Sequence, residues 1–214
     1  TTIQGLFAAG DGVGAAPHKF SSGSFTEGRI AAKSAVNFVA DNPSAPTVND
    51  ANVRGIQETI WAPLETFEKH KGASSSAEIN PNYMTPKQGL VRLQKIMDEY
   101  GAGASTGYTT NQPTLERGIE LMEMFREDLT HLAARNRHEL MRCWELIHRT
   151  WVGEAHLRHL LHRKETRWPG YYYRSDFPDL DDANWRVFVN SKFDAASNSW
   201  NLMTRPYKNI ITSI

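Results

Sequence analysis

The residues whose types and spacing suggest chemistry stand near the start of the chain. Gly10, Gly12 and Gly14 surround Asp11 in a glycine-rich loop, and a helical pattern follows from about Gly23. Glycines permit tight turns and close approach of backbone to a ligand, and Asp11 could accept hydrogen bonds from a ribose or ribityl hydroxyl. A helix start also attracts anions, because its first amide groups lack partners. The pattern favours a bound cofactor, although an ordinary strand, loop and helix connection has the same spacing.

A second stretch, residues 163–185, combines basic, acidic and aromatic residues. We expect Arg167 and Arg174 to pair with Glu165 and Asp176 and so fix the turn that leaves the last long helix. Five aromatic residues between Trp168 and Phe177 are expected to bury a large area in this corner. A subunit interface is the competing interpretation, because Trp, Tyr and Arg are enriched at such surfaces.

The elements that would position these residues follow from the periodicity of apolar side chains. A buried strand is predicted at Gly5–Ala9, and a helix capped by Ser22 or Ser24 follows over Gly23–Ala40 with Arg29 and Lys33 exposed. The sequence from Asp41 to Asp50 contains two prolines among turn-forming residues and predicts a domain boundary.

Helical spacing continues through most of the remaining chain. A helix from Ala51 should kink or restart at Pro63, and Thr85-Pro86 predicts the capped start of another helix that ends at Gly101. A further helix capped by Thr114 leads into a long helical segment that reaches about Glu165. These three or four antiparallel helices predict a bundle, and a β-hairpin around the turn 194–199 should close the chain, with its first strand beginning at Trp185.

The predicted fold class is therefore an α/β fragment followed by a mainly α-helical domain. The fragment, residues 1–45, would be the last strand, loop and helix of an FAD-binding Rossmann-like domain, and residues 46–214 would form the helical C-terminal domain with its terminal hairpin. We expect the chain to be the C-terminal part of a longer polypeptide, because it starts with Thr1 and enters a strand at once.

Composition limits the possible functions. The 214 residues include 24 basic and 24 acidic side chains, so the formal net charge of zero gives no electrostatic case for binding nucleic acid or an anionic membrane. No apolar run approaches the roughly 20 residues that span a bilayer, which favours a cytoplasmic protein. Cys143 is the only cysteine and cannot supply the thiolates of an iron–sulfur cluster.

The histidines do not indicate a metal site. His156, His159 and His162 are spaced by three, so on a helix the third lies about 240° around the axis from the first, and the three side chains cannot converge on one ion.

Two segments carry a resemblance to a known family. The sequence resembles the fumarate reductase and succinate dehydrogenase flavoprotein superfamily, and within it the alpha subunits of adenylyl-sulfate (APS) reductases. The matching segments are Gly5-Leu6-Phe7-Ala8-Ala9-Gly10-Asp11, His18-Lys19-Phe20-Ser21-Ser22-Gly23-Ser24, Gly23-Ser24-Phe25-Thr26-Glu27-Gly28-Arg29, and the stretch Arg163–Trp185 with its Trp-Pro-Gly-Tyr-Tyr-Tyr-Arg sequence.

The resemblance implies an enzyme subunit with noncovalent FAD that interconverts APS with AMP and sulfite in dissimilatory sulfur metabolism. It also implies a beta subunit with two four-iron iron–sulfur clusters as partner, with the pyrophosphate site of FAD and the main catalytic residues outside this chain. On the substrate side, Phe20 stands where the sequence departs from the succinate and fumarate enzymes and offers a face on which an adenine could stack. His18 is either a substrate-side residue or a loop histidine bonded to backbone. By match to the family's motif, the chain would also contact the cofactor. The cofactor-side residues would be Asp11 at the ribityl chain and Ser22, Gly23, Ser24 and Phe25 at the isoalloxazine.

Two other classes of protein stay open. A fumarate reductase, succinate dehydrogenase or aspartate oxidase-like flavoprotein would share the fold. The succinate and fumarate enzymes, however, carry His-Gly-Ala-Asn-Arg after this loop, whose His and Arg bind a dicarboxylate, whereas this chain has His18-Lys19-Phe20-Ser21-Ser22 and lacks the arginine. A non-enzymatic helical interaction module is the second alternative.

Overall fold

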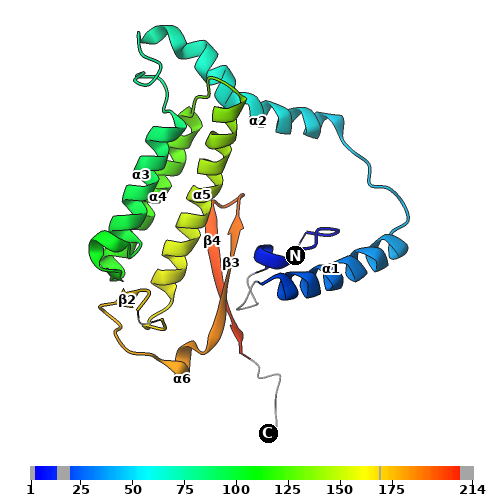
Figure 1. The fold of residues 1–214 in the computed structure, drawn as a ribbon, viewed down its shortest axis with the longest axis vertical. Coiled ribbons are helices and arrows are strands. Elements are labelled where there is room, and N and C mark those ends of the chain that lie inside the picture. Colours follow the sequence, from blue (N-terminus) through cyan, green and yellow to red (C-terminus); the bar gives the residue numbers. More distant parts are fainter. Residues whose placement is uncertain (1–2, 14–19, 169, 208–214) are drawn as a thin grey trace. The chain divides into compact units, whose positions relative to one another are not determined.

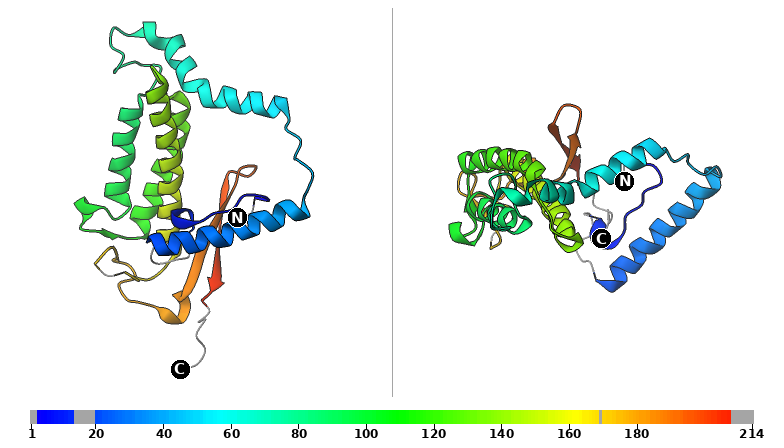
Figure 2. Two further views of the ribbon diagram at one scale, coloured as in Figure 1. Left: turned by 45° about the vertical axis from the view of Figure 1, so that its right-hand side comes forward. Right: turned by 90° about the horizontal axis from the view of Figure 1, so that it is seen from above.

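The computed structural model describes residues 3–13, 20–168 and 170–207. The chain forms two compact units, Thr1–Arg54 and Gly55–Ile214. The division falls inside helix α2, Asp50–His70, so that its first turn belongs to the first unit and the rest to the second. Figures 1 and 2 show the ribbon from three directions.

The first unit consists of a short 3₁₀ helix, Gly10–Gly12, and helix α1, Ser21–Asp41. Helix α1 confirms the helix predicted from Gly23. Its N-cap is Phe20, which makes no capping bond with its side chain, so the predicted cap at Ser22 or Ser24 is wrong. No residue of α1 is buried within the chain, and Ile30 and Val36 are 61% and 68% exposed.

The buried strand predicted at Gly5–Ala9 is wrong for the chain as it stands. Gly5 lies in a turn with φ of +78°, and Leu6 is exposed. A strand requires a neighbouring strand for its backbone groups, and the described part of the first unit contains none. The apolar character of this segment alone therefore does not produce a strand.

Helix α2 carries Pro63 in its interior, and Figure 1 shows the helix changing direction along its length. Proline removes one backbone donor and clashes with the preceding turn, which explains the predicted kink. The carbonyl of Pro63 accepts a hydrogen bond from the N–H of Ala134 at 2.9 Å, which ties α2 to the segment before the last long helix.

Three helices form the bundle of the second unit: α3 (Pro86–Tyr100), α4 (Gln112–Asp128) and α5 (Arg137–His162). Thr85 caps α3 in a reciprocal capping box with Gln88, and Pro86 occupies the first turn, as the sequence predicts. The predicted cap at Thr114 is wrong, because Asn111 caps α4 and the N–H of Thr114 is the donor. Asn136 caps α5, so the predicted long segment is two helices joined through residues 129–136.

The bundle core is apolar, and a glycine sits at two helix crossings. A Cβ on Gly89 would come within 2.4 Å of Leu146 Cδ2, and one on Gly118 within 2.7 Å of Tyr100 Cβ. A larger residue at Gly118 would force the helices to shift, because Tyr100 Cβ is fixed to its backbone, whereas one at Gly89 would displace the end of the Leu146 side chain. The core residues, all buried, are Leu93, Ile96, Leu115, Ile119, Met122, Phe125, Leu132, Ala134, Leu140, Cys143, Leu146, Leu157 and Leu160.

Two small sheets complete the second unit. Strands β1 (Thr109–Thr110) and β2 (Tyr173–Arg174) pair in parallel, and β3 (Val187–Asp194) and β4 (Ser199–Pro206) form the predicted hairpin, in register from Val187 opposite Pro206 to Asp194 opposite Ser199. The short helix α6, Asp182–Trp185, precedes the hairpin, so Trp185 is helical and not the first residue of a strand. The described structure is thus mostly helical with small sheets.

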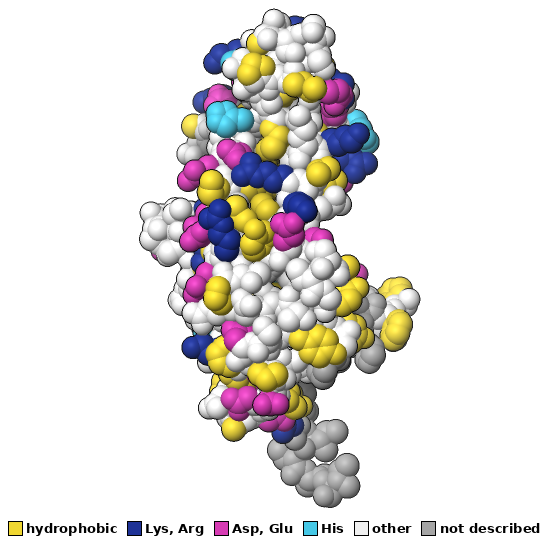
Figure 3. Space-filling model, turned by 90° about the vertical axis from the view of Figure 1, so that its left-hand side faces the viewer, with side chains coloured by type: hydrophobic (Ala, Val, Ile, Leu, Met, Phe, Trp, Pro, Cys, Tyr) yellow, Lys and Arg dark blue, Asp and Glu magenta, His cyan; other side chains and the backbone are white. Residues whose placement is uncertain are grey.

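The surface carries charges of both signs. On the face drawn in Figure 3, basic and acidic side chains lie among apolar ones, in keeping with the net charge of zero. Among the described helices, none combines the length and the apolar character needed to cross a bilayer.

Candidate functional site

The glycine-rich loop is held against the start of helix α1. The N–H of Gly10 donates to Glu27 Oε2 at 2.8 Å, and Gly10 has a φ of +62°, a left-handed conformation that favours glycine. A Cβ at this position would lie 3.4 Å from Ser24 Oγ. That distance is an ordinary van der Waals contact, so the left-handed backbone conformation, and not lack of space, is what favours glycine at position 10.

The structure brings only some of the predicted cofactor residues together. Ser24, half-buried, lies beside Gly10, and Gly23 is also half-buried one position earlier in α1. Asp11, Ser22 and Phe25 are exposed, and Phe25 is 79% exposed. The carbonyl of Ser22 accepts a hydrogen bond from Thr26 Oγ1 at 2.9 Å within the helix.

The predicted substrate residues flank the same helix start. Phe20 is the N-cap of α1, and its side chain is 70% exposed. His18 lies outside the described residues.

The first turn of α1 has the character of an anion-binding helix start. Its N-cap makes no side-chain capping bond, and its amides carry the positive end of the helix macrodipole. A cavity of about 250 Å³ lies nearby between the loop and α1, and its lining includes Phe7, Val13 and Ile30. It is below the roughly 300–1,000 Å³ of typical ligand pockets, so the cavity alone would not enclose a ligand of drug size or larger.

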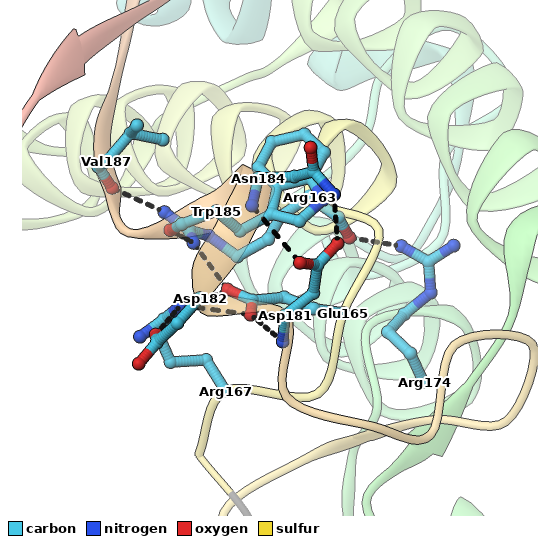
Figure 4. Close-up of polar contacts among 9 residues, drawn as sticks. All are labelled: Arg163, Glu165, Arg167, Arg174, Asp181, Asp182, Asn184, Trp185 and Val187. Atoms are coloured by element: carbon cyan, nitrogen blue, oxygen red, sulfur yellow. Dashed lines mark hydrogen bonds and ion pairs between the residues drawn. The ribbon is translucent and has the colours of Figure 1, made fainter.

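The second predicted region is centred on the buried carboxylate of Glu165, which is 0% exposed. Arg163 Nη1 lies 2.6 Å and Arg167 Nε 2.6 Å from Glu165 Oε1, while Oε2 accepts from Arg167 Nη2 at 3.0 Å and from the N–H of Asp181 at 2.9 Å. Figure 4 shows the two arginines converging on this carboxylate. The predicted pair of Arg167 with Glu165 is confirmed, and Arg163 is an additional partner.

The two arginines also reach beyond Glu165. Arg167 Nη2 contacts Asp182 Oδ1 at 2.9 Å, and Arg163 donates to the carbonyls of Trp185 at 2.8 Å and Val187 at 2.9 Å (Figure 4). The end of α5 is thereby joined to α6 and to the first residue of the hairpin.

Arg174 forms the other half of this corner and is fully buried. Its Nε and Nη2 donate to the two oxygens of Asp176 at 2.9 and 2.8 Å, as predicted, and its Nη1 donates to the carbonyls of Leu160 and Arg163 at the end of α5. Asp176 Oδ2 accepts in turn from the N–H of Gln112 at the start of α4. The ion pair connects the start of α4 to the end of α5, the next α-helix along the chain.

The electrostatics of the corner keep its carboxylates ionised. Burial raises the pKa of Glu165, but hydrogen bonds from Arg167, the Asp181 N–H and Arg163 outweigh it, so the pKa lies below its ordinary value. The pKa of Asp176 is likewise lowered, since the bonds from Arg174 and Gln112 exceed the effect of burial. Groups of this kind hold structure and do not exchange protons near neutral pH.

The prediction that the aromatic residues of this corner are buried is wrong for most of them. Trp168 is 63%, Tyr171 78% and Tyr173 41% exposed, whereas Tyr172 packs against the core. The reason is that Arg174 and Glu165 occupy the interior of the corner. The N–H of Tyr173 donates to the carbonyl of Tyr108, itself 50% exposed, at 2.8 Å. We call Tyr108, Trp168, Tyr171 and Tyr173 the aromatic patch.

A third polar cluster was not found by the sequence analysis. Glu154, 0% exposed on α5, accepts from Arg126 Nη1 at 2.9 Å, Arg158 Nε at 2.9 Å and Trp200 Nε1 at 2.7 Å. The guanidinium of Arg126 also lies 4.3 Å from the centre of the Trp151 ring. This cluster seats the hairpin on the bundle. Its only local sequence signal is the spacing of Glu154 and Arg158 by four.

Three further titratable groups have pKa values shifted by burial. Burial raises the pKa of the Cys143 thiol to about 12, with a smaller contribution from Glu139, so the thiol stays protonated. Burial also lowers the pKa of His156 and of His159, which favours their neutral forms.

Comparison with known proteins identifies the family. Residues 91–211 match the family described as the fumarate reductase flavoprotein C-terminal domain. The chain is 46% identical over 211 residues to the adenylylsulfate reductase subunit alpha of Megalodesulfovibrio gigas, which covers 99% of this chain and 32% of that protein. The chain thus spans about a third of the length of this relative.

Solved structures agree. Adenylylsulfate reductase from Archaeoglobus fulgidus superimposes with a TM-score of 0.95 at 55% identity, over 100% of this chain and 33% of that one, and a structure of the reductase with sulfite as a covalent adduct gives the same values. The quinol fumarate reductase of E. coli matches with a TM-score of 0.69 at 20% identity, over 99% of this chain and 35% of that one, which shows a shared fold. The chain is a homologue of adenylylsulfate reductase alpha subunits and belongs to the fumarate reductase flavoprotein C-terminal family.

Proposed function

We propose that this chain is the C-terminal part of an FAD-dependent adenylyl-sulfate reductase, which interconverts APS with AMP and sulfite. The observation that carries the proposal is the similarity over the full 214 residues, at 55% identity, to a reductase that was solved as a sulfite adduct. The fumarate and succinate enzymes resemble the chain at only 20% identity, and Ser22 stands where their motif has the dicarboxylate-binding arginine.

We infer that residues 1–45 complete the FAD-binding domain and that residues 46–214 form the helical domain. The name of the matched family, a flavoprotein, supports a bound flavin. Exposed apolar side chains along α1 support the inference, since the remaining two-thirds of a reductase subunit would provide an apolar surface to cover them. The pyrophosphate-binding unit of FAD would lie in that remainder.

The chain's own residues would hold one end of the flavin. Asp11, exposed in the loop, would accept a hydrogen bond from a ribityl hydroxyl, and Ser22, Gly23, Ser24 and Phe25 would face the ring system. The bound flavin would supply the two-electron chemistry. The start of α1, with no side-chain cap, would stabilise negative charge that develops beside it.

Phe20 and His18 would contribute to the substrate side. The exposed ring of Phe20 would stack on the adenine of APS or AMP. Stacking of a base on an aromatic side chain contributes about 1–3 kcal/mol. His18, two positions before it, would lie near the same substrate.

The partner would be a beta subunit with two four-iron clusters. The single buried cysteine of this chain cannot ligate a cluster, so electrons would have to reach the flavin from another polypeptide. We propose the aromatic patch as part of the contact with that subunit, because it combines exposed Trp and Tyr side chains on a rigid, ion-paired corner. A cytoplasmic location fits these substrates. The absorbance of the flavin in the intact subunit, recorded with sulfite and AMP, tests the proposed activity.

A further inference from the structure

A groove distinct from the glycine-rich loop and from the Glu165 corner lies between the start of α3 and the first half of α5. It encloses about 650 Å³ and includes Pro86 and Leu90 from α3 and Leu146 from α5. These apolar side chains form its floor. The close approach of Gly89 to Leu146 holds the two helices together beside it, so the floor is a fixed part of the core.

The rim of the groove is charged, with an excess of cations. It carries Lys87 and three arginines against three glutamates, in a chain whose formal net charge is zero. At one end the charge of Arg135 is already balanced by two carboxylates, since its guanidinium contacts Glu78 Oε1 at 2.8 Å and Glu139 Oε1 at 2.7 Å. The excess of positive charge therefore resides at the other end.

At that other end two arginines share one carboxylate. Arg142 Nη1 lies 3.3 Å and Arg149 Nη2 3.7 Å from the same oxygen, Glu145 Oε2. Both contacts are longer than the usual charge-assisted hydrogen bond of about 2.7–2.9 Å. The two arginine side chains are 50% and 52% exposed, and Lys87 makes no ion pair within the described part of the chain.

Most donors of these arginines are unused. A guanidinium has five N–H donors, yet Arg142 makes one hydrogen bond to a side chain and Arg149 makes none among the described residues. The carboxylate of a ligand placed between them could accept paired hydrogen bonds from both guanidinium groups. Ion pairs at a half-exposed site contribute little binding free energy, so the ligand also needs an apolar side chain that packs on the floor of the groove.

We propose that this groove docks an acidic segment of a partner protein chain, with an apolar side chain on Pro86, Leu90 and Leu146 and a carboxylate between Arg142 and Arg149. A peptide segment supplies both groups at once, whereas a free inorganic anion would leave the apolar floor uncovered. The inference rests on this groove alone and does not depend on the proposed catalytic activity.

Photo-crosslinking in the intact protein, purified with its partner, tests the proposal. Lys87→p-benzoylphenylalanine places the probe at the rim, and mass spectrometry identifies the crosslinked peptide. The expected peptide belongs to a different chain and contains Asp or Glu next to an apolar residue. Crosslinking to the rest of the same subunit, to a second copy, or to nothing would overturn the proposal.

Charge reversal supplies the matched comparison. Arg142→Glu with Arg149→Glu should lower the crosslinking yield about tenfold or more, and added salt should lower the wild-type yield. Arg117→Glu changes an arginine of similar exposure on α4, which pairs with Glu120 at 2.8 Å, and should leave the yield unchanged.

Two checks separate charge from folding. Because Arg142 and Arg149 are half-exposed, the charge-reversed variant should retain its helical circular dichroism. Arg142→Lys with Arg149→Lys keeps the positive charge and should retain part of the crosslinking yield. Equal yields from the reversed and wild-type proteins would contradict the assignment.

Discussion

Arg167 and Glu165 stand two positions apart, and Arg167 holds both oxygens of the buried Glu165 carboxylate, with Nε 2.6 Å from Oε1 and Nη2 3.0 Å from Oε2. The same carboxylate accepts the N–H of Asp181, so one side chain joins the end of α5 to the start of α6. This pair fixes the geometry of the corner that presents the aromatic patch.

Glu165→Gln should destabilise the protein strongly. The change leaves Arg163 and Arg167 without their shared counter-charge in a buried site, where breaking an ion pair costs about 3–5 kcal/mol. Thermal unfolding of the intact subunit near pH 7 measures the effect. Asp182→Asn is the control, because it removes an exposed carboxylate from the same Arg167 and should cost about 1 kcal/mol or less.

The difference between wild type and Glu165→Gln should also depend on pH. Since the folded pKa of Glu165 is lowered from 4.5, its contribution is present in full above pH 4.5 and is lost as pH falls through the folded value. Wild type and variant should therefore converge in stability below pH 4.5. A constant difference down to acid unfolding would show that Glu165 acts by packing and not by charge.

Much of this corner was predictable because its partners are close in sequence. Arg167 lies two positions from Glu165 and Arg174 two positions from Asp176, and the cap at Thr85 with Pro86 is likewise a local signal. The exposure of the aromatic patch was not predictable, since it depends on which side chains fill the interior of the corner.

Features that depend on distant partners were missed. The hydrogen bond from Trp200 to Glu154 spans 46 positions, and nothing near Glu154 indicates that its carboxylate is buried under the hairpin. The strand expected at Gly5–Ala9 failed for the same reason, because a strand is defined by neighbours outside its own sequence.

Phe20→Ala should weaken AMP binding by the intact subunit and leave FAD bound. Loss of one aromatic stack, about 1–3 kcal/mol, corresponds to roughly a fivefold to hundredfold or greater rise in Kd. Equilibrium binding of AMP measures this, with the flavin absorbance recorded on the same sample. Phe20→Tyr preserves the ring face and should bind AMP nearly as wild type does. An unchanged Kd in the alanine variant would mean that Phe20 contacts no adenine.

Trp168→Ala combined with Tyr171→Ala should weaken association with the beta subunit and leave the melting temperature nearly unchanged. Both side chains are more than half exposed, so their truncation removes little internal packing, whereas aromatic residues that act as interface hot spots contribute about 2 kcal/mol or more. Co-purification and titration of the two subunits measure the change. Tyr172→Ala, which removes a ring packed on the core, should instead lower the melting temperature. If the double variant unfolds and Tyr172→Ala does not, then Trp168 and Tyr171 stabilise the fold, and the proposed interface role is wrong.

The most direct test of the proposed function is the visible spectrum of the flavin in the intact, partner-bound subunit. Addition of sulfite together with AMP should bleach the flavin band, because formation of APS from these two substrates would transfer two electrons to FAD. Succinate at the same concentration should leave the band unchanged. Bleaching by succinate, or an unchanged band with sulfite and AMP, would contradict the assignment to adenylyl-sulfate reductase.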